Sequence, residues 1–312
     1  MHRHTTSVLR ALCLALTAAL VAACAGGSAI SVAETAQPSA PAATKATPEA
    51  TAAEAPAAPT PTATPAPRWD DLPTAANDAA ALARQLAMVE AAIRDPDVSG
   101  AQLAWMGHLQ QLAYGRLVDF PDWKDTVLAA LPEQTREAVK ASLDAGKQLR
   151  AIVAPIPKTL PDWKIVEPAP IDELVGYYRE AEAEFGVSWY YLAAIHLVET
   201  RVGRIRGLSS AGAQGPMQFM PGTWAIYGKG DINNARDAIM AAGRYLKAAG
   251  APANMQKALF AYNHSQAYVN ALMGYAGVMR AEPKAYRGYH GWQVYYPTAD
   301  GSVLLPVGWS KS

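Results

Sequence analysis

Residues 188–224, SWYYLAAIHLVETRVGRIRGLSSAGAQGPMQFMPGTW, decide the fold of this chain. Ser188 is a favoured residue for the N-cap of a helix, and residues 189–198 are apolar on nearly every face, which is typical of a helix buried in a core. This apolar run ends at a carboxylate, Glu199, and a loop rich in Gly, Ser and Gln follows it. A charged residue at the end of a buried helix needs a physical explanation.

Two interpretations of Glu199 are open from the sequence. It can end the helix in water, paired with Arg201 or Arg204, or it can be a proton donor. The last turn of a helix lies at the negative end of the helix dipole, which raises the pKa of a carboxyl group there. Burial raises that pKa further, because loss of water disfavours the charged form. A Glu that is protonated near neutral pH is what acid-catalysed cleavage of an acetal requires.

Three motifs follow one another in the second half of the chain. They are residues 199–201 (ETR), 209–221 (SSAGAQGPMQFMP) and 261–263 (AYN). In this order they resemble the motifs of lytic transglycosylases with a goose-type-lysozyme-like (SLT) domain, over about residues 168–285. Those enzymes cleave the glycan strands of bacterial peptidoglycan. The sequence departs from the usual family pattern at Pro216, where Leu is common.

The resemblance implies a reaction in which Glu199 is the single general acid and base. Cleavage of the β-1,4 bond between N-acetylmuramic acid (MurNAc) and N-acetylglucosamine (GlcNAc) would yield a 1,6-anhydroMurNAc product. Ordinary glycosidases need a second carboxylate. The candidates Asp231 and Asp237 look structural, although Asp172 or Glu173 could also be brought close. A hydrolytic muramidase and a catalytically silent peptidoglycan-binding lipoprotein are therefore the alternatives.

The resemblance also implies which residues contact the glycan. Gln218 would offer an amide to the sugar, and Met217 would form an apolar wall. One serine of the loop would face Glu199, and Tyr262 would stabilise the reacting sugar or donate a hydrogen bond near Glu199. The alternative is that Met217 and its neighbours only fill the core. The candidate substrate-binding residues are Ser209, Ser210, Met217, Gln218, Tyr262 and Asn263.

The beginning of the chain has the pattern of an exported lipoprotein. Residues 1–24 combine a short basic start with an apolar run and end in VAAC, which resembles a bacterial lipobox. Cleavage there would leave Cys24 lipidated and would anchor the protein on the extracytoplasmic face of a membrane. A plain signal peptide with an incidental cysteine is the alternative. Cys13 and Cys24 are the two cysteines, so the mature chain is expected to contain no internal disulfide.

Composition and pattern predict a mainly α protein. The chain is 51% hydrophobic, and its net charge is +0, with 27 basic and 27 acidic residues, which gives no sign of a nucleic-acid partner. No His pair has the spacing of a zinc helix, so we expect neither a metal nor a cofactor. The partners expected are peptidoglycan glycan strands and, through Cys24, a membrane.

Five segments are predicted along the chain. The signal peptide, residues 1–24, precedes a disordered linker rich in Ala, Pro and Thr at 25–67. A helical accessory region at 68–157 and a lysozyme-like domain at 158–285 follow. Residues 286–312 are predicted to form a C-terminal β-hairpin with its turn at Asp300-Gly301.

Overall fold

The computed structural model describes residues 68–152 and 156–311. The predicted signal peptide, its Cys24 and the predicted linker at 25–67 lie outside these residues. The described chain is mainly α-helical with two small pairs of strands, as the sequence predicts. Among the described residues, no helix combines the length and the apolar character that crossing a membrane requires.

The helices and strands are as follows. The helices are α1 (Ala79–Arg94), α2 (Gly100–Asp119), the 3-10 helix η2 (Pro121–Trp123), α3 (Lys124–Ala129), α4 (Glu133–Arg150), α5 (Ile171–Phe185), α6 (Trp189–Thr200), α7 (Pro221–Tyr227), α8 (Ala235–Ala248), α9 (Met255–Asn263), α10 (Gln266–Ala281) and α11 (Ala285–His290). Strand β1 (Lys164–Ile165) pairs antiparallel with β2 (Ile205–Arg206), and β3 (Val294–Thr298) pairs antiparallel with β4 (Gly301–Leu305).

Capping side chains fix several of the helix ends. Asp78, Asn234, Asn254 and Ser265 each accept a hydrogen bond from a backbone N–H in the first turn of their helix. Ser188 occupies the N-cap position of α6, as predicted, but its side chain makes no capping hydrogen bond. These caps set the residues at which α1, α8, α9 and α10 begin.

The C-terminal hairpin is confirmed, but its turn lies one residue earlier than predicted. Thr298 pairs with Gly301, so the two-residue loop is Ala299-Asp300 and Gly301 is already the first residue of β4. Gly301 has a φ of 119°, a conformation that strains any residue with a side chain. The prediction that Gly301 lies at the turn is thus close, but Gly301 follows the two-residue loop and is not the second residue of it.

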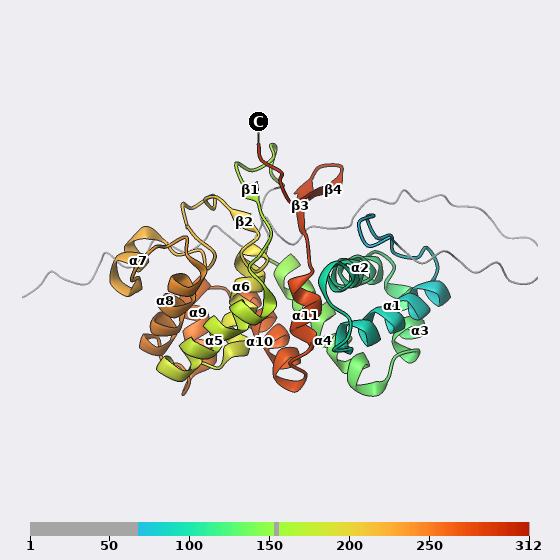
Figure 1. The fold of residues 1–312 in the computed structure, drawn as a ribbon, viewed down its shortest axis with the longest axis horizontal. Coiled ribbons are helices and arrows are strands. Elements are labelled where there is room, and N and C mark those ends of the chain that lie inside the picture. Colours follow the sequence, from blue (N-terminus) through green and yellow to red (C-terminus); the bar gives the residue numbers. More distant parts are fainter. Residues whose placement is uncertain (1–67, 153–155, 312) are drawn as a thin grey trace, which may run out of the picture.

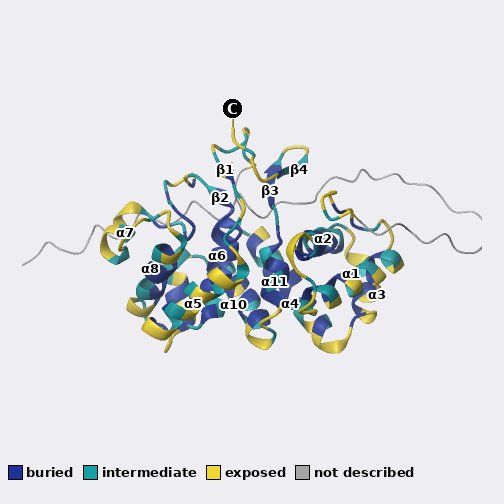
Figure 2. Cartoon of the chain, viewed as in Figure 1, coloured by how far each residue is buried: buried dark blue, intermediate teal, exposed yellow. Residues whose placement is uncertain are grey.

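The central helices join the two halves of the described chain. In Figure 1, α5, α8 and α9 lie on one side, α1 to α3 lie on the other, and α4, α10 and α11 lie between them. Helix α10 packs against both α4 and α6. One hydrophobic cluster extends from Ala75 to Trp292 through both halves, and Figure 2 shows its buried residues along α6 and α11. The accessory helices and the lysozyme-like segment thus share a core.

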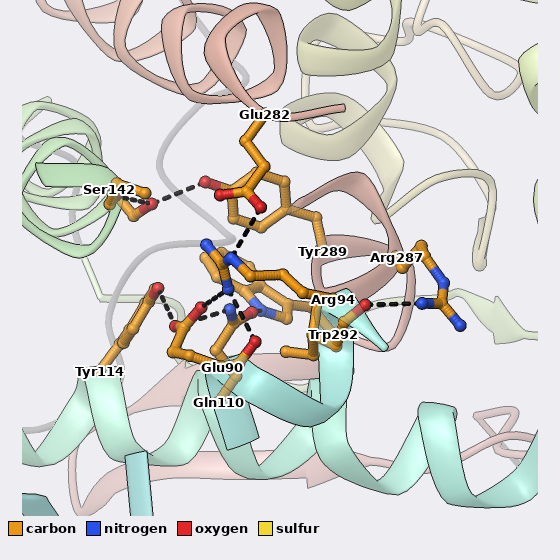
Figure 3. A network of polar contacts seen from close by, with 11 residues as sticks. Glu90, Arg94, Gln110, Tyr114, Ser142, Glu282, Arg287, Tyr289 and Trp292 are labelled. Atoms are coloured by element: carbon orange, nitrogen blue, oxygen red, sulfur yellow. Dashed lines mark hydrogen bonds and ion pairs between the residues drawn. The ribbon is translucent and has the colours of Figure 1, made fainter. Parts of the chain in front are cut away.

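A buried polar network also crosses this junction (Figure 3). Glu90 on α1 accepts hydrogen bonds from Gln110 and Tyr114 on α2, and its Oε2 lies 2.5 Å from Arg94 Nη1. Arg94 Nε lies 2.9 Å from Glu282, just beyond α10. The network therefore ties the N-terminal helices to the end of the helix that contacts α6.

Candidate active site

Glu199 lies in the last turn of α6, a helix whose residues are almost all buried. The side chain is 6% exposed, and its Oε1 accepts a hydrogen bond of 2.6 Å from the Tyr268 hydroxyl. Burial raises the pKa of Glu199 to about 7, and the hydrogen bond from Tyr268 opposes this rise only in part. Glu199 is thus placed to hold and to release a proton near neutral pH.

The two arginines that the sequence offered as partners of Glu199 have other contacts. Arg204 Nη1 lies 3.2 Å from Glu167 Oε2, and the Arg201 guanidinium lies 5.6 Å over the ring of Trp292. Arg201 also donates to the carbonyl of Leu197. Within the described residues, Glu199 accepts its hydrogen bond from a neutral hydroxyl, so burial still raises the pKa of the carboxyl group.

Tyr268 was missed by the sequence reasoning. It lies in the first turn of α10, which Ser265 caps, and its side chain is fully buried. Burial first, and then the nearby Glu199, raise the pKa of its hydroxyl well above the usual value, so it remains a hydrogen-bond donor. The available signal was a tyrosine six residues after Tyr262, at the start of the next helix.

The chain after Glu199 is held firmly at the end of α6. Arg201 and Val202 both have left-handed backbone conformations, which end the helix. The Thr200 hydroxyl donates to the Pro216 carbonyl at 2.6 Å and accepts from the Gly203 N–H at 3.0 Å. Thr200 thereby ties the helix end that carries Glu199 to the second motif.

The second motif forms a tight loop. Gly215 has a φ of 73°, and a Cβ there would lie 1.9 Å from the Ile232 carbonyl oxygen, so only glycine fits. The backbone N–H and the side-chain amide of Gln218 both donate to the Gly215 carbonyl. The Ser209 hydroxyl accepts hydrogen bonds from Ala211 and Ala213 within the same loop. Ser210, by contrast, is exposed.

Tyr262, in the third motif, is hydrogen-bonded to the backbone of this loop. Tyr262 donates its hydroxyl to the Met217 carbonyl at 2.6 Å, whereas Tyr268 donates to Glu199. The Met217 side chain is fully buried and Phe219 is 3% exposed, so both fill the core in this conformation. Asn263 ends α9 and is partly exposed. Of the candidate residues, Ser210 is exposed, and Gln218, Tyr262 and Asn263 are partly exposed.

Three of the four carboxylates considered as second catalytic groups, Asp231, Asp237 and Glu173, accept hydrogen bonds from nearby residues. Asp237 accepts a hydrogen bond from the Asp231 N–H, and Asp231 accepts one from the Asn233 N–H. Glu173 accepts from the Tyr177 hydroxyl, and Asp172 lies in the first turn of α5. These contacts stabilise turns and helix ends, as the sequence predicted for Asp231 and Asp237.

A mainly helical fold built around a buried glutamate at a helix end is the arrangement of a lysozyme-like domain. Residues 176–280 match the family described as Transglycosylase SLT domain, so the chain contains such a domain, and this match supports a function on peptidoglycan in general. The match begins within α5 and ends within α10, and it includes Glu199, all three motifs and Tyr268. The search of curated proteins and the search of solved structures each gave no match.

Proposed function

We propose that the protein is a peptidoglycan lytic transglycosylase that cleaves the β-1,4 bond between MurNAc and GlcNAc and forms 1,6-anhydroMurNAc. The observation that supports this most directly is the buried Glu199, whose pKa of about 7 makes it a proton donor at neutral pH. The SLT match supports the substrate class.

The reaction has two steps that share one carboxyl group. Glu199 donates its proton to the glycosidic oxygen, the bond from this oxygen to C1 of MurNAc breaks, and GlcNAc leaves with a free 4-hydroxyl. The ionised Glu199 then takes the proton from the C6 hydroxyl of the same MurNAc, and O6 attacks C1 to close the anhydro ring. No water is consumed, and Glu199 regains its proton. The Tyr268 hydroxyl stabilises the ionised carboxylate between the two steps.

The remaining candidate residues divide into two roles. Gln218, Asn263 and Ser210 contact the glycan, since each reaches the surface near the motif loop. Ser209, Met217 and Tyr262 shape that loop through their hydrogen bonds or their packing.

Hydrolysis is the second candidate reaction. It requires a carboxylate that activates water, and the hydrogen bonds of Asp231 and Asp237 within their own turn and helix argue against their use. A silent glycan-binding protein would have no use for a carboxyl group whose pKa burial raises to about 7.

Mass spectrometry of the products tests the proposed reaction. The fragment of residues 68–312 and its Glu199→Gln variant are incubated separately with purified peptidoglycan. The masses of the released muropeptides are then measured. We expect 1,6-anhydromuramoyl ends that disappear with the substitution. Reducing muramoyl ends would show hydrolysis instead, and co-sedimentation with the wall without any release would show a binding protein.

The proposed location is the extracytoplasmic face of a bacterial membrane, with a lipid on Cys24 and residues 25–67 as a tether to the wall. Metabolic labelling with a fatty-acid analogue tests the anchor. The label should appear on the full chain and be lost in Cys24→Ser, and an unlabelled full chain would contradict the proposal.

A further inference from the structure

A small pocket lies where the N-terminal helices meet the SLT domain. Its volume is about 80 Å³, and its walls come from α2, α4, α10, Arg201 and the segment around Trp292. A single water needs about 10–15 Å³ by this measure, so the pocket holds several waters or one small polar group. Because Arg150 is exposed at the end of α4, the pocket opens to solvent there.

The pocket has a positive and hydrogen-bonding lining. Arg150 and Arg201 both contribute to it, and the described residues that line it include neither Asp nor Glu. A Cβ placed on Gly146 would lie 3.3 Å from Arg150 Nη1 and 3.6 Å from the Tyr275 hydroxyl, so these two groups meet at the surface of α4. Burial raises the pKa of Tyr275, and the two arginines lower it, which places both cations near this hydroxyl. A guanidinium binds carboxylates in a planar, two-pronged manner.

The pocket lies close to the catalytic carboxyl group. Arg201 follows Glu199 by two residues, which limits the separation of their Cα atoms to about 7 Å. Tyr275 follows Tyr268 by seven residues on α10, so the two side chains lie on one face of the helix and about 10 Å apart along its axis. Tyr268 donates to Glu199, whereas Tyr275 lines the pocket. A substituent of a substrate held at Glu199 would therefore have to span about 10 Å to enter the pocket.

We infer that this pocket, here called the Arg150–Arg201 pocket, binds a carboxylate of the peptide stems attached to the glycan. This inference rests on the proposed substrate. Peptidoglycan carries its carboxylates on stems that leave the MurNAc ring, the same ring whose C1 reacts at Glu199. The pocket is too small for a whole sugar ring with its substituents and fits the end of an acidic side chain. The N-terminal helices thus supply part of the substrate-binding surface, through Arg150 and the walls from α2 and α4.

The test separates stem binding from glycan binding and from catalysis. Two forms of peptidoglycan are prepared, one with intact stems and one from which an amidase has removed them. Binding to each is measured by co-sedimentation in the Glu199→Gln background, where no cleavage removes the substrate. We expect the parent protein to bind the intact form more tightly, and we expect Arg150→Gln to weaken binding to it about tenfold, as for one charge-assisted hydrogen bond. Binding to the stripped glycan should stay unchanged.

Two further variants keep the result clear if one substitution disturbs the fold. Gly146→Ala replaces a glycine inside α4, which should raise the melting temperature while it crowds Arg150 and Tyr275. Gly146→Ala should weaken binding to peptidoglycan with intact stems and leave binding to the stripped glycan unchanged. Lys147→Gln is the matched control, because Lys147 is an exposed cation in the same turn of α4 that does not line the pocket. It should behave like the parent.

Three results would overturn the inference. Arg150→Gln and Gly146→Ala could bind both forms like the parent, or they could lose binding to both forms equally. Inorganic phosphate could displace the intact form as well as a soluble stem peptide does, which would make the pocket a general anion site. A protein that cleaves nothing but shows the stem-dependent binding would refute the proposed reaction and leave the pocket assignment standing.

Discussion

Glu90 and Glu199 are two buried glutamates on helices of one shared core, and their surroundings differ in one decisive way. Glu90 is 2% exposed and Glu199 is 6% exposed, and each accepts a hydrogen bond from a buried tyrosine. Glu90 also accepts from Gln110 and forms an ion pair with Arg94. Glu199, by contrast, accepts its hydrogen bond from the neutral hydroxyl of Tyr268.

The difference shows that the partner of a buried carboxylate, more than its burial, decides its use. Although burial lowers the pKa of Arg94, the ion pairs with Glu90 and Glu282 raise it overall, so this cation stays charged and the network holds the N-terminal helices in place. Glu199 lies next to a neutral donor, and burial raises its pKa to about 7. One glutamate thus stabilises the fold, and the other can exchange a proton.

The largest effect should come from Glu199→Gln, which keeps the shape and removes the proton. We expect the rate of release of anhydromuramoyl ends to fall about 10²–10⁴-fold, which is the usual contribution of general acid–base catalysis. Glu180→Gln is the matched control, because Glu180 is partly exposed and pairs with Arg236 at the surface. Equal rates for Glu199→Gln and the parent would show that Glu199 is not the proton donor.

Glu90→Gln should act on stability instead. Loss of one partner from a buried ion pair costs about 3–5 kcal/mol, because Arg94 would then lose a charged neighbour. Calorimetry should record a melting temperature lower by about 10 °C. Glu137→Gln, which affects an exposed pair with Lys140, should cost at most about 1 kcal/mol. Similar melting temperatures for the two variants would show that the network does not hold the helices together.

Stability should depend on pH through Glu199. Its pKa is raised in the folded protein from 4.5 to about 7, so the folded state holds this proton more tightly than the unfolded state does. The resulting stability is fully present below pH 4.5 and is lost as the pH rises through about 7, a change of about 3 kcal/mol.

Chemical denaturation at several pH values, with the parent and Glu199→Gln side by side, measures this loss. The difference between the two proteins cancels the opposite effect of His108 and His196, whose pKa values burial lowers to about 4 and about 3. A difference that stays constant from pH 4.5 to 8 would contradict the account.

The smallest effect is expected for Tyr268→Phe. The hydrogen bond from Tyr268 lowers the pKa of Glu199, so its removal should raise that pKa and move the alkaline limb of the pH–rate profile to higher pH. The stability cost should be about 1–2 kcal/mol. Tyr289→Phe, which removes a buried hydroxyl bonded to Ser142, should cost a similar amount without moving the limb. A shift in both variants would indicate a general loss of packing.

Local sequence signals predicted much of the fold. The sequence predicts a helix at residues 171–185 that Gly186 ends, and α5 has these bounds, with Gly186 at a φ of 73°. The short helices α3, α7 and α11 were not predicted, because a helix of six or seven residues depends on tertiary packing more than on its own sequence. The pairing of β1 with β2 joins residues about 40 positions apart, which no local pattern specifies.

The sequence predicted the acid of the candidate site, Glu199, but not its hydrogen-bond partner, Tyr268. The apolar run before Glu199 indicated a buried carboxylate, whereas the contact with Tyr268 depends on how α10 packs against α6. Glu90 was overlooked, although its position four residues after Leu86 and three before Ile93 places it on the buried face of α1. Spacing can thus show that a glutamate is buried, but only the folded structure shows whether its partner is an arginine or a tyrosine.

The most direct test of the central claim is the pKa of the Glu199 carboxyl group. Carbon-13 NMR of protein labelled at the glutamate side-chain carboxyl gives this value, with the Glu199 signal assigned by its absence from Glu199→Gln. The account predicts a midpoint of about 7. A midpoint near 4.5 would mean that Glu199 is ionised at neutral pH, and it would contradict the assignment of this residue as the proton donor.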